Sequence, residues 1–147
     1  MLCKNQHRRK GGGNCMTNII NCLPHAVCVY AGSLYDPASG CSIGGTEILR
    51  IPPSGFVATA KSSIFSLSPI TIDGVDVPSC KREFAAVSQL PESDNPNTLY
   101  VVSSVYAQAA AELGMDTSRM ITPYGTVKVN GRIVGCTGLI MNAREAG

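Results

Sequence analysis

One histidine and two cysteines are the residues best suited to covalent chemistry or metal binding. His25 follows Pro24 and lies three positions from both Cys22 and Cys28. A cysteine beside a histidine would suit a Cys-His hydrolase, and the same side chains would suit one half of a zinc site. The sequence lacks a second pair of zinc ligands, and His25 stands where a strand is expected to begin. We therefore expect His25 to be a hydrogen-bonded structural residue.

No other signature of catalysis stands out in the sequence. It contains no Ser-x-x-Lys or P-loop motif, and its 10 acidic residues are scattered. The 7 cysteines are an odd number without a Cys-x-x-Cys pair, which favours reduced thiols packed as small apolar side chains. We expect a protein that is not an enzyme and that uses neither a metal nor a cofactor.

The composition predicts one small folded domain. Of the 147 residues, 44% are hydrophobic and only 15% are charged. Residues 1–15 form a basic, glycine-rich tail that we expect to be disordered, so the domain should span residues 16–147. The low charge leaves apolar surface for a second subunit to cover, which favours a homo-oligomer, either a dimer or a hexamer.

The distribution of charge and hydropathy argues against two classes of partner. The net charge is +2, and four of the positive side chains stand within the first ten residues, so the folded part has no basic footprint for duplex nucleic acid. No apolar run reaches the roughly 18–20 residues that a membrane span needs. We expect a cytoplasmic protein.

One segment, Thr98–Leu113, has the pattern of a true helix. Its first residues suit an extended entry, Ser103 or Ser104 can cap a helix with a broad apolar face, and Gly114 can end it. A single helix among strands must cover one face of a sheet. The predicted fold class is therefore α+β, an antiparallel sheet with hairpins and one main helix.

The remaining segments have the pattern of strands and turns. Asp-Gly and Asn-Gly dipeptides favour type I′ turns and predict two hairpins, at Ile70–Val77 and Val127–Val134. Further strands are expected at 18–30 (interrupted by a proline), 47–51, 56–60 and 81–87. Loops are expected at 35–45 and 90–97, and a polar connector is expected at 115–124.

Five landmarks occur in an order that resembles a known family. They are Asn21-Cys-Leu-Pro24-His25, Pro53-Ser54-Gly55, Leu90-Pro91, Tyr100-Val-Val-Ser103 before an alanine-rich helix, and Gly131-Arg-Ile-Val-Gly-Cys136. Over residues 17–140 the chain thereby resembles the phage Thoeris anti-defence proteins of the first type, which act as sponges. Leu23 replaces a threonine of that pattern, and the segments 33–46 and 114–126 are longer than in the family.

The resemblance implies a binding function. A protein of this family works in the cytoplasm of an infected bacterium, where it sequesters a cyclic ADP-ribose isomer made by a TIR-domain defence enzyme and does not degrade it. The resemblance also implies a symmetric homo-oligomer with ligand pockets between subunits, and some members hold cyclic oligonucleotides as well. A different class of function stays open: a phage accessory protein that binds and masks a host protein.

A cyclic nucleotide with a pyrophosphate calls for cations, an aromatic ring and amide or hydroxyl groups. By their positions in the resembled pattern, Gln108 would supply an amide and Lys128 a positive charge, and Arg132 lies across the same hairpin with a guanidinium suited to phosphate. The other candidates are cationic or aromatic: Arg50, Lys61, Tyr100, Arg119 and Tyr124. Each of them also suits an ordinary surface or core position.

Overall fold

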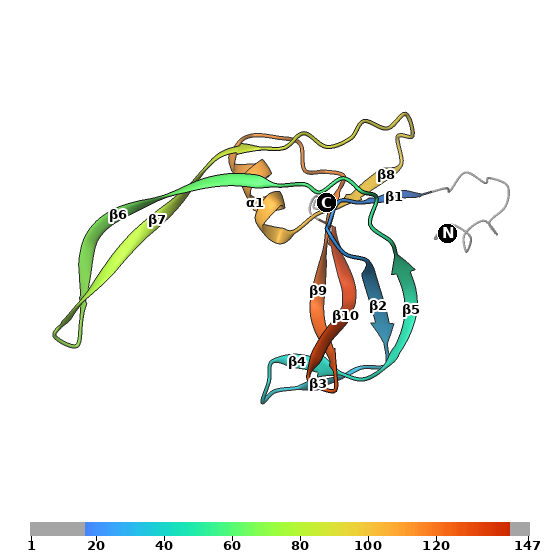
Figure 1. Cartoon of the computed structure of the whole chain (residues 1–147), viewed down its shortest axis with the longest axis horizontal. Helices are drawn as coiled ribbons and strands as arrows, with labels where there is room; N and C mark the ends of the chain where they lie inside the picture. Colours follow the sequence, from blue (N-terminus) through green and yellow to red (C-terminus); the bar gives the residue numbers. More distant parts are fainter. Residues whose placement is uncertain (1–16, 142–147) are drawn as a thin grey trace, which may run out of the picture.

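The computed structural model describes residues 17–141, and the expected basic tail lies outside them. In these residues 57% form strands and only 7% form helix, and the main sheet is strongly curved and nearly closed (Figure 1). The predicted α+β class is therefore wrong, because the protein is mostly β with one short helix. The sequence pattern of the helix is real, but it covers too few residues to form a layer of its own.

The main sheet has eight strands, of which six follow the order β1-β8-β9-β10-β2-β5, with β4 beside β9 and β3 beside β4. The eight strands are β1 (Asn18–Asn21), β2 (Val27–Ala31), β3 (Leu34–Asp36), β4 (Cys41–Ile43), β5 (Thr46–Ile51), β8 (Thr98–Val101), β9 (Met120–Val129) and β10 (Arg132–Met141). Four of the pairings are parallel: β1 with β8, β8 with β9, β2 with β10, and β4 with β9. The expected purely antiparallel sheet is thus also wrong.

The helix α1 (Ser104–Glu112) forms where the sequence predicts it. The Ser103 side chain accepts a hydrogen bond from the Tyr106 backbone N–H at 3.0 Å, and Gly114 follows with φ +81°. The apolar face was expected to consist of Val105, Tyr106, Ala109, Ala110 and Leu113, and this expectation is partly wrong because Val105 and Leu113 are 44% and 40% exposed. The buried residues of α1 are Tyr106 and three alanines, and the small alanine side chains let α1 pack closely as the crossover between the parallel strands β8 and β9.

The alternation of side chains along β8 divides the core into two clusters. Tyr100 points to the α1 side, where it packs with Tyr106 and Met120. Val101 points to the other side, where it packs with Ile121 and the residues of β2 and β10. Because successive side chains of a strand face opposite ways, β8 contributes to both clusters and so joins the helix to the sheet.

Both predicted hairpin turns are confirmed. Asp73 and Gly74 have φ of 49° and 80°, and Asn130 and Gly131 have φ of 55° and 78°, as a type I′ turn requires. The first hairpin is much longer than expected, since it joins β6 (Ala60–Ile72) to β7 (Val75–Val87) in a separate two-stranded sheet. The strand expected at 81–87 is the end of β7. We call residues 60–87 the arm, because they project away from the rest of the molecule (Figure 1).

Three expectations from local pattern are wrong or only partly right. Of the strand expected at 56–60 only Ala60 belongs to a sheet. Phe56 and Ala58 instead pack against the cluster that contains Tyr106 and Met120. The loop expected at 35–45 contains parts of β3 and all of β4, which form a small hairpin against β9. The connector expected at 115–124 ends early, since β9 begins at Met120. Within the described residues no helix is long enough and apolar enough to cross a membrane.

Candidate functional site

The two side chains singled out on α1 and β8, Gln108 and Tyr100, each have a hydrogen-bond partner within the chain. Tyr100 is only 7% exposed, and its hydroxyl donates a 2.7 Å hydrogen bond to the Pro91 carbonyl. Gln108 lies on the exposed side of α1 and donates to the Glu112 carboxylate at 3.2 Å. The ring of Tyr100 therefore belongs to the core, and Gln108 is an ordinary paired helix residue.

The two cations of the β9–β10 hairpin point to opposite faces of that ribbon. Lys128 is in register with Ile133, and the next pair along is Val129 with Arg132. Neighbouring pairs of an antiparallel ladder alternate between the two faces of the ribbon. Lys128 and Arg132 of one chain therefore cannot both contact the same phosphate. Lys128 instead lies between Ile133 and Ile43, its partner in β4.

The remaining cationic candidates are dispersed over the molecule. Arg50, on the edge strand β5, makes a two-pronged ion pair with Glu47 at 2.9 and 3.1 Å, and this hydrogen bonding raises the pKa of Arg50. It lines a shallow pocket of about 260 Å³ beside β1. Lys61 stands at the base of the arm opposite Ala86. Arg119 contributes its backbone carbonyl, which accepts from the Tyr100 N–H.

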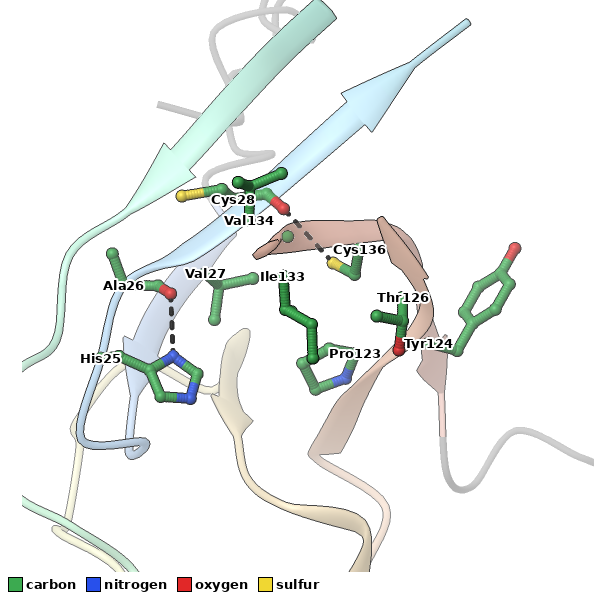
Figure 2. A pocket seen from close by; sticks show the side chains of 11 residues that line it. His25, Ala26, Val27, Cys28, Pro123, Tyr124, Thr126, Ile133, Val134 and Cys136 are labelled. Atoms are coloured by element: carbon green, nitrogen blue, oxygen red, sulfur yellow. Dashed lines mark hydrogen bonds between the residues drawn. The ribbon is translucent and has the colours of Figure 1, made fainter. Parts of the chain in front are cut away.

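The larger pocket lies where β2, β9 and β10 meet and has a volume of about 380 Å³ (Figure 2). Val27 and Cys136 are buried and form its apolar floor. The more exposed His25, Thr126 and Ile133 stand around its opening. A pocket of this size, with apolar walls and a few polar groups, has the properties of a small-molecule site.

Of the eight residues expected to bind a nucleotide, Tyr124 is the one that lines this larger pocket. Its ring is half exposed and lies at the rim, turned away from His25 (Figure 2). A Cβ atom at Gly138 would come within 2.5 Å of that ring, so the absence of a side chain at Gly138 gives the ring its place on β10. The tyrosine can therefore border a ligand without filling the pocket.

Gly135 explains how the pocket floor is built. A Cβ atom there would overlap the Cys28 carbonyl oxygen and come within 2.9 Å of the Tyr30 ring. Only glycine allows β10 to approach β2 this closely. The same approach brings the Cys136 thiol to 3.6 Å from the Cys28 carbonyl, to which it donates. The Gly-Cys dipeptide thus has a structural purpose that its sequence pattern does not explain.

Among the described residues, Cys28 and Cys136 are not arranged with His25 as a nucleophile and its base. Burial raises the pKa of the Cys136 thiol above its ordinary value, so it is protonated near neutral pH. The Cys28 sulfur points away from the His25 ring, whose Nδ1 lies 3.0 Å from the Ala26 carbonyl (Figure 2). Within residues 17–141 no three His, Cys, Asp or Glu side chains gather as metal ligands.

His25 is hydrogen-bonded as expected, yet it is exposed at the pocket opening rather than buried. The structural residue of this landmark is Asn21, which is 1% exposed. Its side-chain amide donates to the carbonyls of His25 and Ile51, both at 3.0 Å, and its oxygen accepts from the Leu23 N–H at 2.9 Å. Asn21 and His25 both belong to the first landmark, but the sequence alone does not show that Asn21 is the buried one of the two.

Comparisons of this chain with protein-family models, with curated proteins and with solved structures give no match.

Proposed function

We propose that this protein binds a cyclic nucleotide of the cyclic ADP-ribose class and sequesters it without degrading it. The observation that carries the proposal is the convergence of two landmarks on one pocket. His25 comes from the first landmark and Gly135 and Cys136 from the last, and all three line the same 380 Å³ cavity. These are the two ends of the pattern by which the chain resembles the sponge proteins.

The chemistry of the pocket suits the nucleoside part of such a ligand. Val27 in the floor and Ile133 at the opening offer apolar surfaces to a base, and the imidazole of His25 and the hydroxyl of Thr126 can hydrogen-bond to ribose oxygens. None of the described residues that line the pocket is a lysine or an arginine. In this proposal the pyrophosphate therefore stays at the open side of the pocket.

The state of the thiols supports retention of the ligand rather than its hydrolysis. A cysteine nucleophile must be a thiolate, and burial works against that form at Cys136. Cys28 is directed away from His25, so the imidazole cannot act as its base in this arrangement (Figure 2). Neither the Cys-His hydrolase nor the masking of a host protein gains a comparable supporting observation at this pocket.

The proposal is tested by uptake and recovery of the nucleotide. The protein is incubated with cyclic ADP-ribose isomers, removed by filtration and heated, and the released compound is identified. We expect release of the unchanged nucleotide. Release of a converted product would replace the sponge by a hydrolase, and absence of uptake together with a co-purifying host polypeptide would favour the masking protein.

Calorimetric titration of two variants identifies the pocket used. His25→Ala removes a hydrogen-bonding group at the opening and should weaken binding about tenfold, the value of one lost hydrogen bond of about 1.4 kcal/mol. Lys128→Ala is the control, because its side chain does not line the pocket. If Lys128→Ala weakened binding and His25→Ala did not, the ligand would not occupy this cavity.

A further inference from the structure

The arm carries a continuous apolar stripe on one of its two faces. Strand register places Leu67 opposite Ser79, Ile70 opposite Val77, and Ile72 opposite Val75. Alternate residues of β7 share a face, so these pairs lie on the same side of the ribbon, together with Phe65 opposite Lys81. The stripe consists of six side chains: Phe65, Leu67, Ile70, Ile72, Val75 and Val77.

A bulge in β6 makes this stripe continuous. Two residues, Ser68 and Pro69, stand between the paired positions Leu67 and Ile70, whereas the facing strand has one residue between the corresponding pairs. In a regular strand without a bulge, Ile70 stands three positions after Leu67 and would point to the opposite face. The Ser79 hydroxyl donates to the Ser68 carbonyl at 2.7 Å and so holds the bulge in place.

The two faces of the arm differ in polarity. On the face opposite the stripe, the Thr71 hydroxyl donates to Asp76 at 2.8 Å, and Ile64 faces Arg82. On the stripe, every one of the six side chains stays 36–61% exposed in the described structure. An isolated two-stranded ribbon is at best marginally stable in water, so an apolar face of this length needs a cover.

The edges of the arm are poorly suited to adding a further strand. Pro69 in β6 and Pro78 in β7 each lack a backbone N–H. A proline in the middle of an edge strand interrupts the ladder that an incoming strand would form. The arm is therefore built for contact through its apolar face rather than through its edges.

We propose that the stripe packs face to face against the same stripe on the arm of a second copy of this chain, about a two-fold axis. With 36–61% of each residue exposed, or roughly 85 Å² per residue, two stripes would bury at most about 1,000 Å² in total, which is the lower limit for a specific protein–protein interface. An apolar stripe is complementary to itself, as a two-fold contact requires.

The charge of the arm also fits a partner of the same sequence. Residues 60–87 contain three basic side chains (Lys61, Lys81 and Arg82) and three acidic ones (Asp73, Asp76 and Glu83), so the arm is formally neutral. Lys81 and Glu83 already neutralise one another in a 2.7 Å ion pair. Two arms can thus approach without net repulsion, and the arm has no excess charge that would select an acidic or a basic partner.

The test compares two isoleucines of β6 that face opposite ways. Ile70→Glu places a charge in the stripe, and Ile64→Glu places the same charge on the other face, where Ile64 is equally exposed at 57% against 53% for Ile70. Sedimentation velocity across the micromolar range measures the mass of the wild type and of both variants. Circular dichroism and thermal unfolding check that the body of each variant is folded.

We expect the wild type to sediment with at least twice the 15.4 kDa mass of one chain. We expect Ile70→Glu to weaken association at least tenfold and Ile64→Glu to leave it unchanged. A single-chain mass for the wild type would overturn the proposal. The stripe would then have to be covered by a different protein. Full association of Ile70→Glu, or equal dissociation of both folded variants, would show that the stripe is not the interface.

Discussion

Asn21→Ala should destabilise the protein strongly, because the Asn21 side chain satisfies two backbone groups in the bend between β1 and β2 and a third at the end of β5. Alanine leaves the Leu23 N–H and the carbonyls of His25 and Ile51 without their present partner. At about 1 kcal/mol net for each hydrogen bond, the free energy of unfolding should fall by about 3 kcal/mol. That is a large share of the roughly 5–15 kcal/mol that stabilises an ordinary domain.

Urea unfolding followed by circular dichroism measures this loss, with the slope of the transition expected to stay unchanged. Asn97→Ala is the matched control, since Asn97 is exposed and should change stability by less than about 0.5 kcal/mol. The Asn21 amide also holds the backbone of His25, so nucleotide binding should weaken in the same variant. A loss below about 1 kcal/mol, or a similar loss in Asn97→Ala, would refute the argument.

Three further outcomes are expected from the core and the pocket floor. Tyr106→Phe removes the 2.5 Å hydrogen bond to the Ser88 carbonyl at the base of the arm, so urea unfolding should show a loss of about 1 kcal/mol, and an unchanged midpoint would contradict it. Gly135→Ala forces β10 away from the Cys28 carbonyl, and we expect lower thermal stability and loss of nucleotide uptake; full uptake would refute the assigned pocket floor. Burial raises the pKa of the Cys22 thiol to about 11 from 9.0, so the unfolded chain loses this proton first as pH rises. The free energy of unfolding should therefore fall between about pH 9 and 11, measured by urea titration at both limits, and Cys22→Ala should reduce that fall; an identical profile in the variant would contradict the assignment.

The predictions that are confirmed rest on signals that act within a few residues. Asp73-Gly74 and Asn130-Gly131 form the predicted turns because their backbone conformation depends on the dipeptide itself. Ser103 caps α1 as expected, since its hydroxyl needs only a backbone N–H three residues ahead. These signals do not say how far a strand continues, so the arm was expected to be far shorter than it is.

The candidate site was less predictable, because its residues meet only through strand pairing. The amino-acid types pointed to cations and aromatic rings, and only Tyr124 of that set lines the larger pocket. Lys128 and Arg132 are four positions apart and look adjacent in sequence, but the ladder directs them to opposite faces. Whether a polar side chain is buried, as Asn21 is, depends on which distant backbone groups surround it.

The sequence by itself determined the turns, the helix cap and the interruption between the first two strands, because each depends on the conformational preferences of neighbouring residues. Only the tertiary structure decided that β10 lies parallel to β2 with Gly135 at the point of closest approach, and that His25 opens onto the resulting cavity. Cys28 and Cys136 are 108 positions apart and carry no local signal of their contact. Their meeting follows from the packing of the whole curved sheet, which no short segment can specify.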